Sequence, residues 1–353
     1  MPIPRKLIQA LPKADLHSHI DGSVSGKDLF RIAKDHGRKL LTPRGTELDS
    51  VTALMRYIEG DGYSSLLETV VDRFYPITNM MQEGETIRDV GVAYLRGRKQ
   101  DGVAYAEGRF APQYHTREGL TLDDVIAFMA DGLAEGAERH GVRACLIVAI
   151  GRESPADLGL EVAKAAASSR SAVALDLGGP EVGHPPQKFK DAFKLAAESG
   201  LNTTVHAGEG AGSRRKNLAY IDAAIRQLGA KRVGHAIDLV RDEGLMELVR
   251  ERSVGVELNP ISNLVLRKIN SLRDLSIDRL LERGIRASLN SDDPALWPRG
   301  SLSEVYSEVC RAYGFGFREL DLLAQNAFRT AFCPKDTKKW LLEEYHATRR
   351  RLA

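Results

Sequence analysis

Eight short apolar runs, separated by stretches with helical periodicity, constrain the fold of this 353-residue chain more than any other feature. Runs of this kind, nearly free of polar interruptions, are typical of strands that are buried on both faces of a parallel sheet. Alternation with helices such as 122–140 and 242–252 predicts an α/β protein, a (β/α)8 barrel, whose core needs roughly 250 residues. The eight predicted strands are 14–20, 103–107, 144–150, 172–177, 202–206, 232–237, 254–258 and 285–289.

The additional length lies mainly between the first two predicted strands. The segment of about 27–99 has helical patterning and no convincing strand, with Leu54, Tyr57 and Ile58 at helical spacing. We expect a helical insertion here, which is either a small subdomain or a lid over a site at the end of the first strand. A helical tail follows the last strand. Because no repeat or low-complexity linker interrupts the chain, we expect residues 1–353 to form one domain.

Composition and charge indicate an ordinary soluble enzyme or binding protein. Hydrophobic residues are 43% and charged residues 28%, and the formal net charge is +2. Basic and acidic residues are interleaved, which argues against a nucleic-acid or membrane partner. Cys145, Cys310 and Cys333 show no paired spacing, so neither a disulfide framework nor a thiolate zinc site is expected. Without a signal peptide or an apolar run of membrane-spanning length, a cytoplasmic location is predicted. The sequence indicates no particular oligomeric state.

Polar residues of a few chemical types close the predicted strands. On the first strand His17 and His19 are two residues apart, so their side chains project from the same face and could bind one metal ion. The strand-end residues that carry this pattern along the chain are His17, His19, Asp21, Asp176, Gly179, Glu181, His206, Glu209, His235, Asn259, Asn263, Asp292 and Asp293.

In a (β/α)8 barrel these side chains would meet at one mouth, because the reactive groups of this fold lie at the C-terminal ends of the strands. Three histidines and a carboxylate would make a site suited to zinc, with room for a water. The fourth strand lacks the bridging lysine of many binuclear sites, so one metal ion is expected. Each residue alone could equally be a helix cap or a core residue. The remaining histidines are predicted to be surface or loop residues: His36, His115, His140, His184 and His346.

Four blocks of this sequence resemble the signatures of the adenosine deaminase family, in the family's order and spacing. They are Pro12-Lys13-x-Asp15-Leu16-His17-x-His19-x-Asp21-Gly22, His206-Ala207-Gly208-Glu209, Gly234-His235 and Ser291-Asp292-Asp293-Pro294. The similarity extends from about Leu11 to the segment 326–328. It implies a zinc-dependent (β/α)8 barrel that hydrolyses the 6-amino group of adenine nucleosides, with the site at the barrel mouth and a helical insertion after the first strand.

The resemblance also implies a role for each matched position. Glu209 would donate a proton to N1 of the purine, and His235 would take the proton of the attacking water or stabilise the developing oxyanion. Asp293 would hydrogen-bond the N7 side, the Gly179 backbone N–H would meet N3, and Asp21 would accept from the ribose 5′-hydroxyl. The implied ligands of a single zinc ion are His17, His19, His206 and Asp292.

The neighbouring carboxylates Asp292 and Asp293 would be divided between metal and substrate, since adjacent residues on an extended backbone point apart. Asp21 bears on the substrate, because adenine deaminases of the family usually carry Glu there and bind no ribose. We therefore expect adenosine or 2′-deoxyadenosine as the substrate (EC 3.5.4.4), a small molecule bound without any nucleic acid.

Three departures from the family pattern leave other substrates open. Gly179-Pro180-Glu181 and Gly234-His235-Ala236 differ from the usual residues, and Arg214-Arg215-Lys216 forms a basic run after Glu209. Such a run is usually a solvated loop, but it could receive a phosphate or carboxylate. The alternatives are a deaminase of free adenine or of a 5′- or N6-modified adenosine. A non-catalytic barrel used for binding is a third hypothesis, against which the presence of both Glu209 and His235 argues.

Overall fold

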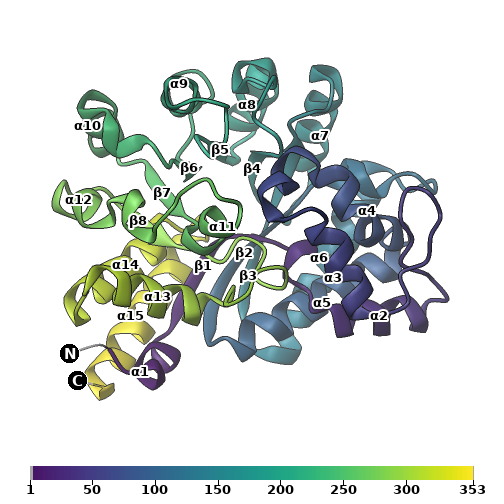
Figure 1. The fold of residues 1–353 in the computed structure, drawn as a ribbon, viewed down its shortest axis with the longest axis horizontal. Helices are drawn as coiled ribbons and strands as arrows, with labels where there is room; N and C mark the ends of the chain where they lie inside the picture. The colour runs from purple at the N-terminus through teal and green to yellow at the C-terminus, as the bar shows by residue number, and fades with distance from the viewer. Residues whose placement is uncertain (1–2, 353) are drawn as a thin grey trace.

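A parallel sheet of eight strands, arranged in the order β1 to β8, forms the centre of the molecule. This computed structural model describes residues 3–352. Figure 1 shows the strands enclosed by helices, with the two chain ends close together beside α1 and α15. The strands are β1 (Lys13–His19), β2 (Val103–Phe110), β3 (Arg143–Gly151), β4 (Ala172–Gly178), β5 (Asn202–Ala207), β6 (Arg232–His235), β7 (Gly255–Leu258) and β8 (Ala287–Leu289).

The sheet closes on itself at Asp292, the third residue after the end of β8. Ser18 and Asp292 form a parallel bridge. The His19 N–H donates to the Asp292 carbonyl at 2.8 Å, and the Asp292 N–H donates to the His17 carbonyl at 2.9 Å. The predicted (β/α)8 barrel is confirmed, and its closing contact lies within the predicted metal-binding residues.

Continuous burial explains why the strands could be recognised in the sequence. Every residue of β6, β7 and β8 is buried, as expected for parallel strands covered by helices on one face and by the opposite barrel wall on the other. The barrel helices and the flanking helices are α1 (Arg5–Ala10), α6 (Leu122–His140), α7 (Ala156–Ser168), α8 (Lys190–Glu198), α9 (Arg214–Arg226), α10 (Glu243–Glu251), α11 (Pro260–Val265), α12 (Ile277–Glu282), α13 (Leu302–Tyr313), α14 (Phe317–Thr330) and α15 (Lys335–Leu352).

The segment between β1 and β2 is helical, as predicted, but it consists of two different parts. The helix α5 (Gly84–Gln100) packs against α6 and β2, and therefore forms the first helix of the barrel layer. The contact is close because a Cβ on Gly132 would overlap the backbone of Arg88. The preceding part, at the right of Figure 1, contains α2 (Gly26–Asp35), α3 (Val51–Glu59), the 3-10 helix Tyr63–Glu68 and α4 (Val70–Met80).

Two sequence-based expectations about individual segments were wrong. His115 is buried rather than at the surface; its ring stacks on Phe110, and its Nδ1 lies 3.1 Å from the Met81 carbonyl. The basic run of residues 214–216 is exposed as expected, but it forms the first turn of α9, capped by the Ser213 side chain, instead of a loop. Among residues 3–352, no helix has the length and apolarity needed to cross a bilayer.

Ion pairs fill part of the barrel interior that other proteins of this fold fill with apolar side chains. Arg232 donates to Glu257 and to Glu107, each at 2.5 Å, and to the Thr330 carbonyl at 2.9 Å. Arg109 donates to Glu257 at 3.1 Å. All four charged side chains are fully buried, so each depends on its partners for the solvation that it has lost.

We expect Arg232→Met to lower the free energy of unfolding by about 3–5 kcal/mol, because it leaves the carboxylates of Glu107 and Glu257 buried without their main partner. Urea denaturation followed by circular dichroism measures this loss. Arg250→Met is the matched control, since Arg250 pairs with Glu247 on the surface of α10. Equal stability of the two variants would contradict the importance of the buried pairs.

Candidate active site

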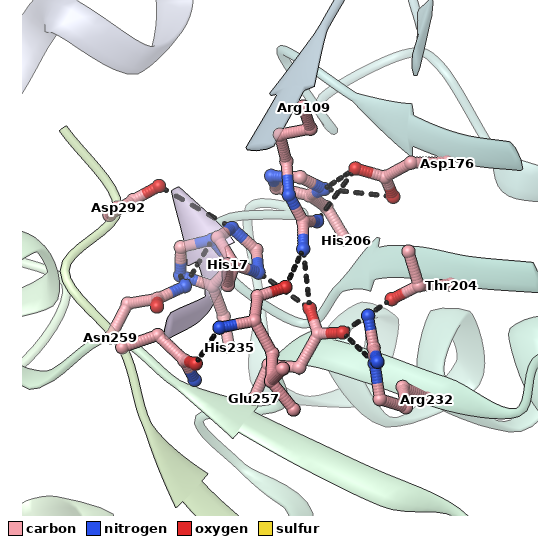
Figure 2. Close-up of polar contacts among 12 residues, drawn as sticks. His17, Arg109, Asp176, Thr204, His206, Arg232, His235, Glu257, Asn259 and Asp292 are labelled. Carbon is pink, nitrogen blue, oxygen red and sulfur yellow. Dashed lines mark hydrogen bonds and ion pairs between the residues drawn. The ribbon is translucent and has the colours of Figure 1, made fainter. Parts of the chain in front are cut away.

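Side chains from β1, β5, β6 and the residues after β8 meet at the C-terminal mouth of the barrel. One ligand atom from each of four buried residues lies within 4.8 Å of the others, and these residues are His17, His206, His235 and Asp292. His19 adjoins the group, with Nε2 at 3.2 Å from His206 Nε2 and at 3.5 Å from Asp292 Oδ1. Figure 2 shows the three buried histidines close to one another, with Asp292 at the edge of the group.

The donor atoms have the spacing and the chemistry of a metal site. Tetrahedral zinc with bonds of about 2.0–2.1 Å sets its ligands about 3.3 Å apart. The corresponding separations include 3.4 Å between His17 Nε2 and Asp292 Oδ1, as well as the two distances of His19. His17 Nε2 is buried and has no hydrogen-bond partner among the described residues. Lone pairs facing one another in this way repel unless a cation lies between them, so His17, His19, His206 and Asp292 fit a zinc ion.

Carboxylates behind the histidines hold two of the rings in one orientation. Glu257 contacts His17 Nδ1 at 2.7 Å, and Asp176 contacts His206 Nδ1 at 3.1–3.2 Å (Figure 2). A proton on each Nδ1 leaves Nε2 as a lone pair directed at the centre of the site. Arg109 joins the two carboxylates, donating to Asp176 at 2.7 Å and to Glu257 at 3.1 Å.

His235 is held differently, because asparagine side chains and not a carboxylate lie within hydrogen-bonding distance of its ring. Its backbone has a φ of 64°, in the left-handed region that a residue other than glycine rarely adopts, and this directs the side chain into the mouth. The side-chain nitrogen of Asn263 lies 2.9 Å from Nδ1, and that of Asn259 lies 3.2 Å from Nε2. Burial lowers the pKa of the imidazole well below its usual value, so the ring is neutral. Glu209 Oε1 lies 3.6 Å from Nδ1.

A cavity opens directly above these groups and has mainly apolar walls. The residues after β1, β4 and β8 that the sequence singled out line it: Asp21, Gly179 and Asp293. Among the described residues, no acceptor bonds the Gly179 backbone N–H. The 3-10 helix and α4 of the insertion supply part of the wall, so this segment covers the mouth, with the side chains of Leu66, Leu67, Val70, Val71, Phe74 and Thr78.

The carboxyl groups of the mouth fall into two protonation states. The histidines hold the pKa of Asp292 well below its usual range despite burial, so Asp292 is ionised. Burial and the charges of Asp292 and Glu181 raise the pKa of Glu209 well above its usual range. Burial and the charges of Asp292 and Asp21 do the same for Asp293. Both shifts favour the protonated form of Glu209 and of Asp293, in which each carboxyl group can donate a hydrogen bond.

Asp292 and Asp293 point apart, but the reason differs from the expected one. Asp292 has a φ of 60°, so the backbone at this point is left-handed and not extended. Its Oδ1 faces His17 and His19, whereas Asp293 lies over Gly22, where a Cβ would overlap the Asp293 carboxyl group. Glycine at position 22 is thus needed for Asp293 to reach the cavity.

The sequence alone indicates no specific role for Asp176, Glu257, Arg109, Asn259 or Asn263. Glu257 and Arg109 stand inside apolar strands, and a charged residue in a fully buried strand is the signal that could have revealed them. The basic residues of the first turn of α9 do not line the cavity, and Arg214 pairs with Asp238 at 3.4 Å.

A closed parallel barrel with histidines and a carboxylate at its mouth defines the class of metal-dependent (β/α)8 hydrolases. Within this class, the family model of adenosine deaminase matches residues 12–348, and the chain belongs to that family.

Relatives in the family carry two different names. An adenine deaminase of Chlorobium phaeobacteroides is 30% identical over 340 residues, which cover 96% of this chain and 97% of the relative. An adenosine deaminase of Mycobacteroides abscessus is 31% identical over 353 residues, which cover 96% and 94%. The crystal structure of an adenine deaminase from Arthrobacter aurescens superimposes with a TM-score of 0.84 at 30% identity, covering 96% of this chain and 98% of that one. The chain is therefore a purine deaminase-type hydrolase by family.

We expect Asp176→Asn to weaken zinc binding by roughly 10–100-fold, because an amide that donates to His206 Nδ1 forces the ring proton onto the nitrogen that faces the site. Competition with a chromophoric chelator measures the affinity without any assay of activity. Asp222→Asn is the control, because Asp222 pairs with Arg226 on the exposed face of α9. Unchanged zinc affinity in the Asp176 variant would show that His206 is not a ligand.

Proposed function

We propose that this protein is a zinc-dependent enzyme that hydrolyses the 6-amino group of adenosine or 2′-deoxyadenosine, giving the inosine product and ammonia. His17, His19, His206 and Asp292 would bind one zinc ion per chain. The observation that carries the proposal is the position of three groups on the cavity wall that can donate hydrogen bonds. These are the carboxyl groups of Glu209 and Asp293, whose pKa values are raised, and the Gly179 N–H. A purine has three ring acceptors, N1, N7 and N3, that this set would match.

The donor set also supports the proposed chemistry. What a bound zinc supplies is a water acidic enough to act as hydroxide near neutral pH. When the nucleophile adds to C6, electron density moves onto N1, and the proton of Glu209 would neutralise it there. His235, neutral and fixed by Asn263, would orient the water and receive its proton, or donate to the oxygen in the transition state. The proton taken from the water would pass to the 6-amino group, and the C6–N bond would break with loss of ammonia. As the C6=O bond forms, the remaining hydroxyl proton would return to Glu209, and the product is the 6-oxopurine.

Asp21 supports a nucleoside as the substrate. One oxygen of its carboxyl group accepts from the Gly22 N–H at 3.1 Å, and the side chain lines the cavity, so it can accept from a sugar hydroxyl. Burial raises its pKa to about 6, which leaves it mainly ionised and acceptor-only at neutral pH. Free adenine is the second candidate, because several curated relatives and one solved structure bear the name adenine deaminase.

We expect Glu209→Gln to lower kcat by roughly 10²–10⁴-fold, since the amide cannot give its proton to N1. The rate is measured from the change in ultraviolet absorbance as the 6-aminopurine becomes the 6-oxopurine. The zinc content, measured by atomic absorption, should equal that of the unmodified protein. Glu247→Gln, on the exposed face of α10, is the control. A kcat close to that of the unmodified protein would show that another group donates the proton.

We expect adenosine and 2′-deoxyadenosine to give the highest kcat/KM in a panel that also contains adenine, AMP and N6-methyladenosine. The reason is that Asp21 can accept a hydrogen bond from a sugar hydroxyl. Free adenine has no such hydroxyl, and the phosphate of AMP carries a negative charge that the Asp21 carboxylate would repel. Initial rates at equal enzyme and zinc concentration decide the order. Strong turnover of adenine beside negligible turnover of adenosine would favour the second candidate instead.

A further inference from the structure

Tyr114 and Glu153 form a polar contact at the wall of the cavity, and neither residue is one of the proposed zinc ligands. Tyr114 belongs to the 3-10 helix Pro112–His115 after β2, and Glu153 follows β3. The Tyr114 hydroxyl donates to Glu153 Oε1, and the Tyr114 side chain lines the cavity. Two consecutive strands of the barrel thus place a phenol and a carboxylate on the same side of the mouth.

Two glycines make room for this pair. A Cβ on Gly151 would overlap the Tyr114 hydroxyl and would lie 2.8 Å from Glu153 Oε1, so a side chain at position 151 would displace both groups. On the neighbouring strand, a Cβ on Gly179 would lie 3.2 Å from Glu153 Oε2. The pair therefore adjoins Gly179, the residue whose free N–H would meet N3 of the purine. N3 is bonded to C2 and to C4, and C4 is bonded to N9. The charge of Asp21, the proposed sugar contact, acts on Tyr114, so the pair lies toward the N9 side of the substrate.

The hydrogen bond to Glu153 determines what Tyr114 can offer to a substrate. A hydroxyl has one proton, and because that proton is given to Glu153, the oxygen can only accept from a further partner. Burial and the charge of Glu153 raise the pKa of Tyr114 well above its usual value, with a contribution from Asp21, so the phenol stays protonated. The Tyr114 oxygen and the Asp21 carboxylate thus act as two acceptors on the wall of one cavity.

We propose that the Tyr114 hydroxyl, positioned by Glu153, is a specificity contact that accepts a hydrogen bond from a donor on the N9 side of the purine. The donor is a sugar hydroxyl of a nucleoside or the ring N–H of a free base. Tyr114 touches the substrate, whereas Glu153 acts through Tyr114 and is a positioning residue. This inference rests on the proposed function, since it requires a 6-aminopurine with C6 at the zinc site.

The test measures kcat and KM for adenosine, adenine and 9-methyladenine, the last of which has no donor at N9. Four variants are compared with the unmodified protein: Tyr114→Phe, Glu153→Gln, Glu153→Leu and Tyr313→Phe. Tyr313 is the matched control, because its hydroxyl donates to the Leu272 carbonyl at 2.7 Å and does not line the cavity. Thermal unfolding of each variant separates a loss of stability from a loss of binding.

We expect Tyr114→Phe to raise KM about tenfold for the substrate that donates to it, with kcat within about threefold and with KM for 9-methyladenine unchanged. Glu153→Leu should do the same, because it frees the phenol proton to point elsewhere. Glu153→Gln should have a smaller effect, since its amide oxygen still accepts that proton. A KM increase for adenosine identifies a sugar hydroxyl as the donor, and an increase confined to adenine identifies the ring N–H.

Different results would overturn the inference and the proposed function. If the unmodified protein deaminates none of the three purines, the proposed function fails and the inference fails with it. If the unmodified protein is active but Tyr114→Phe leaves every KM unchanged, the inference alone fails. If Tyr114→Phe raised KM equally for all three substrates, Tyr114 would only support the fold. The same conclusion would follow if Tyr114→Phe and Tyr313→Phe lost equal stability and neither variant had a selective effect on KM.

Discussion

Closure of the barrel between β1 and the residues after β8 is the contact on which the site depends. The two backbone hydrogen bonds of Asp292, to His17 and to His19, bring the first and last strands together. The same contact sets the Asp292 carboxylate 3.4–3.5 Å from both imidazoles. His17 and His19 lie on the first strand, and Asp292 follows the last strand. In an open sheet these residues would lie at opposite edges. Fold and candidate metal site are thus products of one pairing.

A second constraint is the requirement that the histidines present lone pairs, not protons, to the centre of the mouth. Glu257 and Asp176 meet it by contacting Nδ1 of His17 and of His206. Two carboxylates inside a barrel need compensating charge, and Arg109 and Arg232 supply it from β2 and β6. The polar interior of this barrel therefore orients the proposed zinc ligands, at a cost in desolvation that an apolar core would avoid.

The fold was predictable from the sequence because fully buried parallel strands leave an unmistakable pattern of apolar runs, and α6 even has the predicted bounds. The strand-end residues could be found for a related reason, since polar residues that close such runs share one face of the barrel. Glu257 and Asp176 could be assigned no role, because their partners are 240 and 30 residues away and only the register of the strands brings them together. The burial of His115 could not be predicted, because burial of a single polar residue leaves no periodic pattern in the sequence.

The distribution of protons follows from the same geometry. Asp292 and Asp293 are neighbours in the chain, yet one faces a group of imidazoles and the other faces Asp21 and Glu209. The left-handed backbone at Asp292 directs the two side chains into different environments. The pKa of one carboxyl group is therefore lowered and that of the other is raised. Ionised Asp292 in turn helps to keep Glu209 protonated. Burial is the larger cause of the raised pKa of Glu209, and it does not depend on the charge of Asp292.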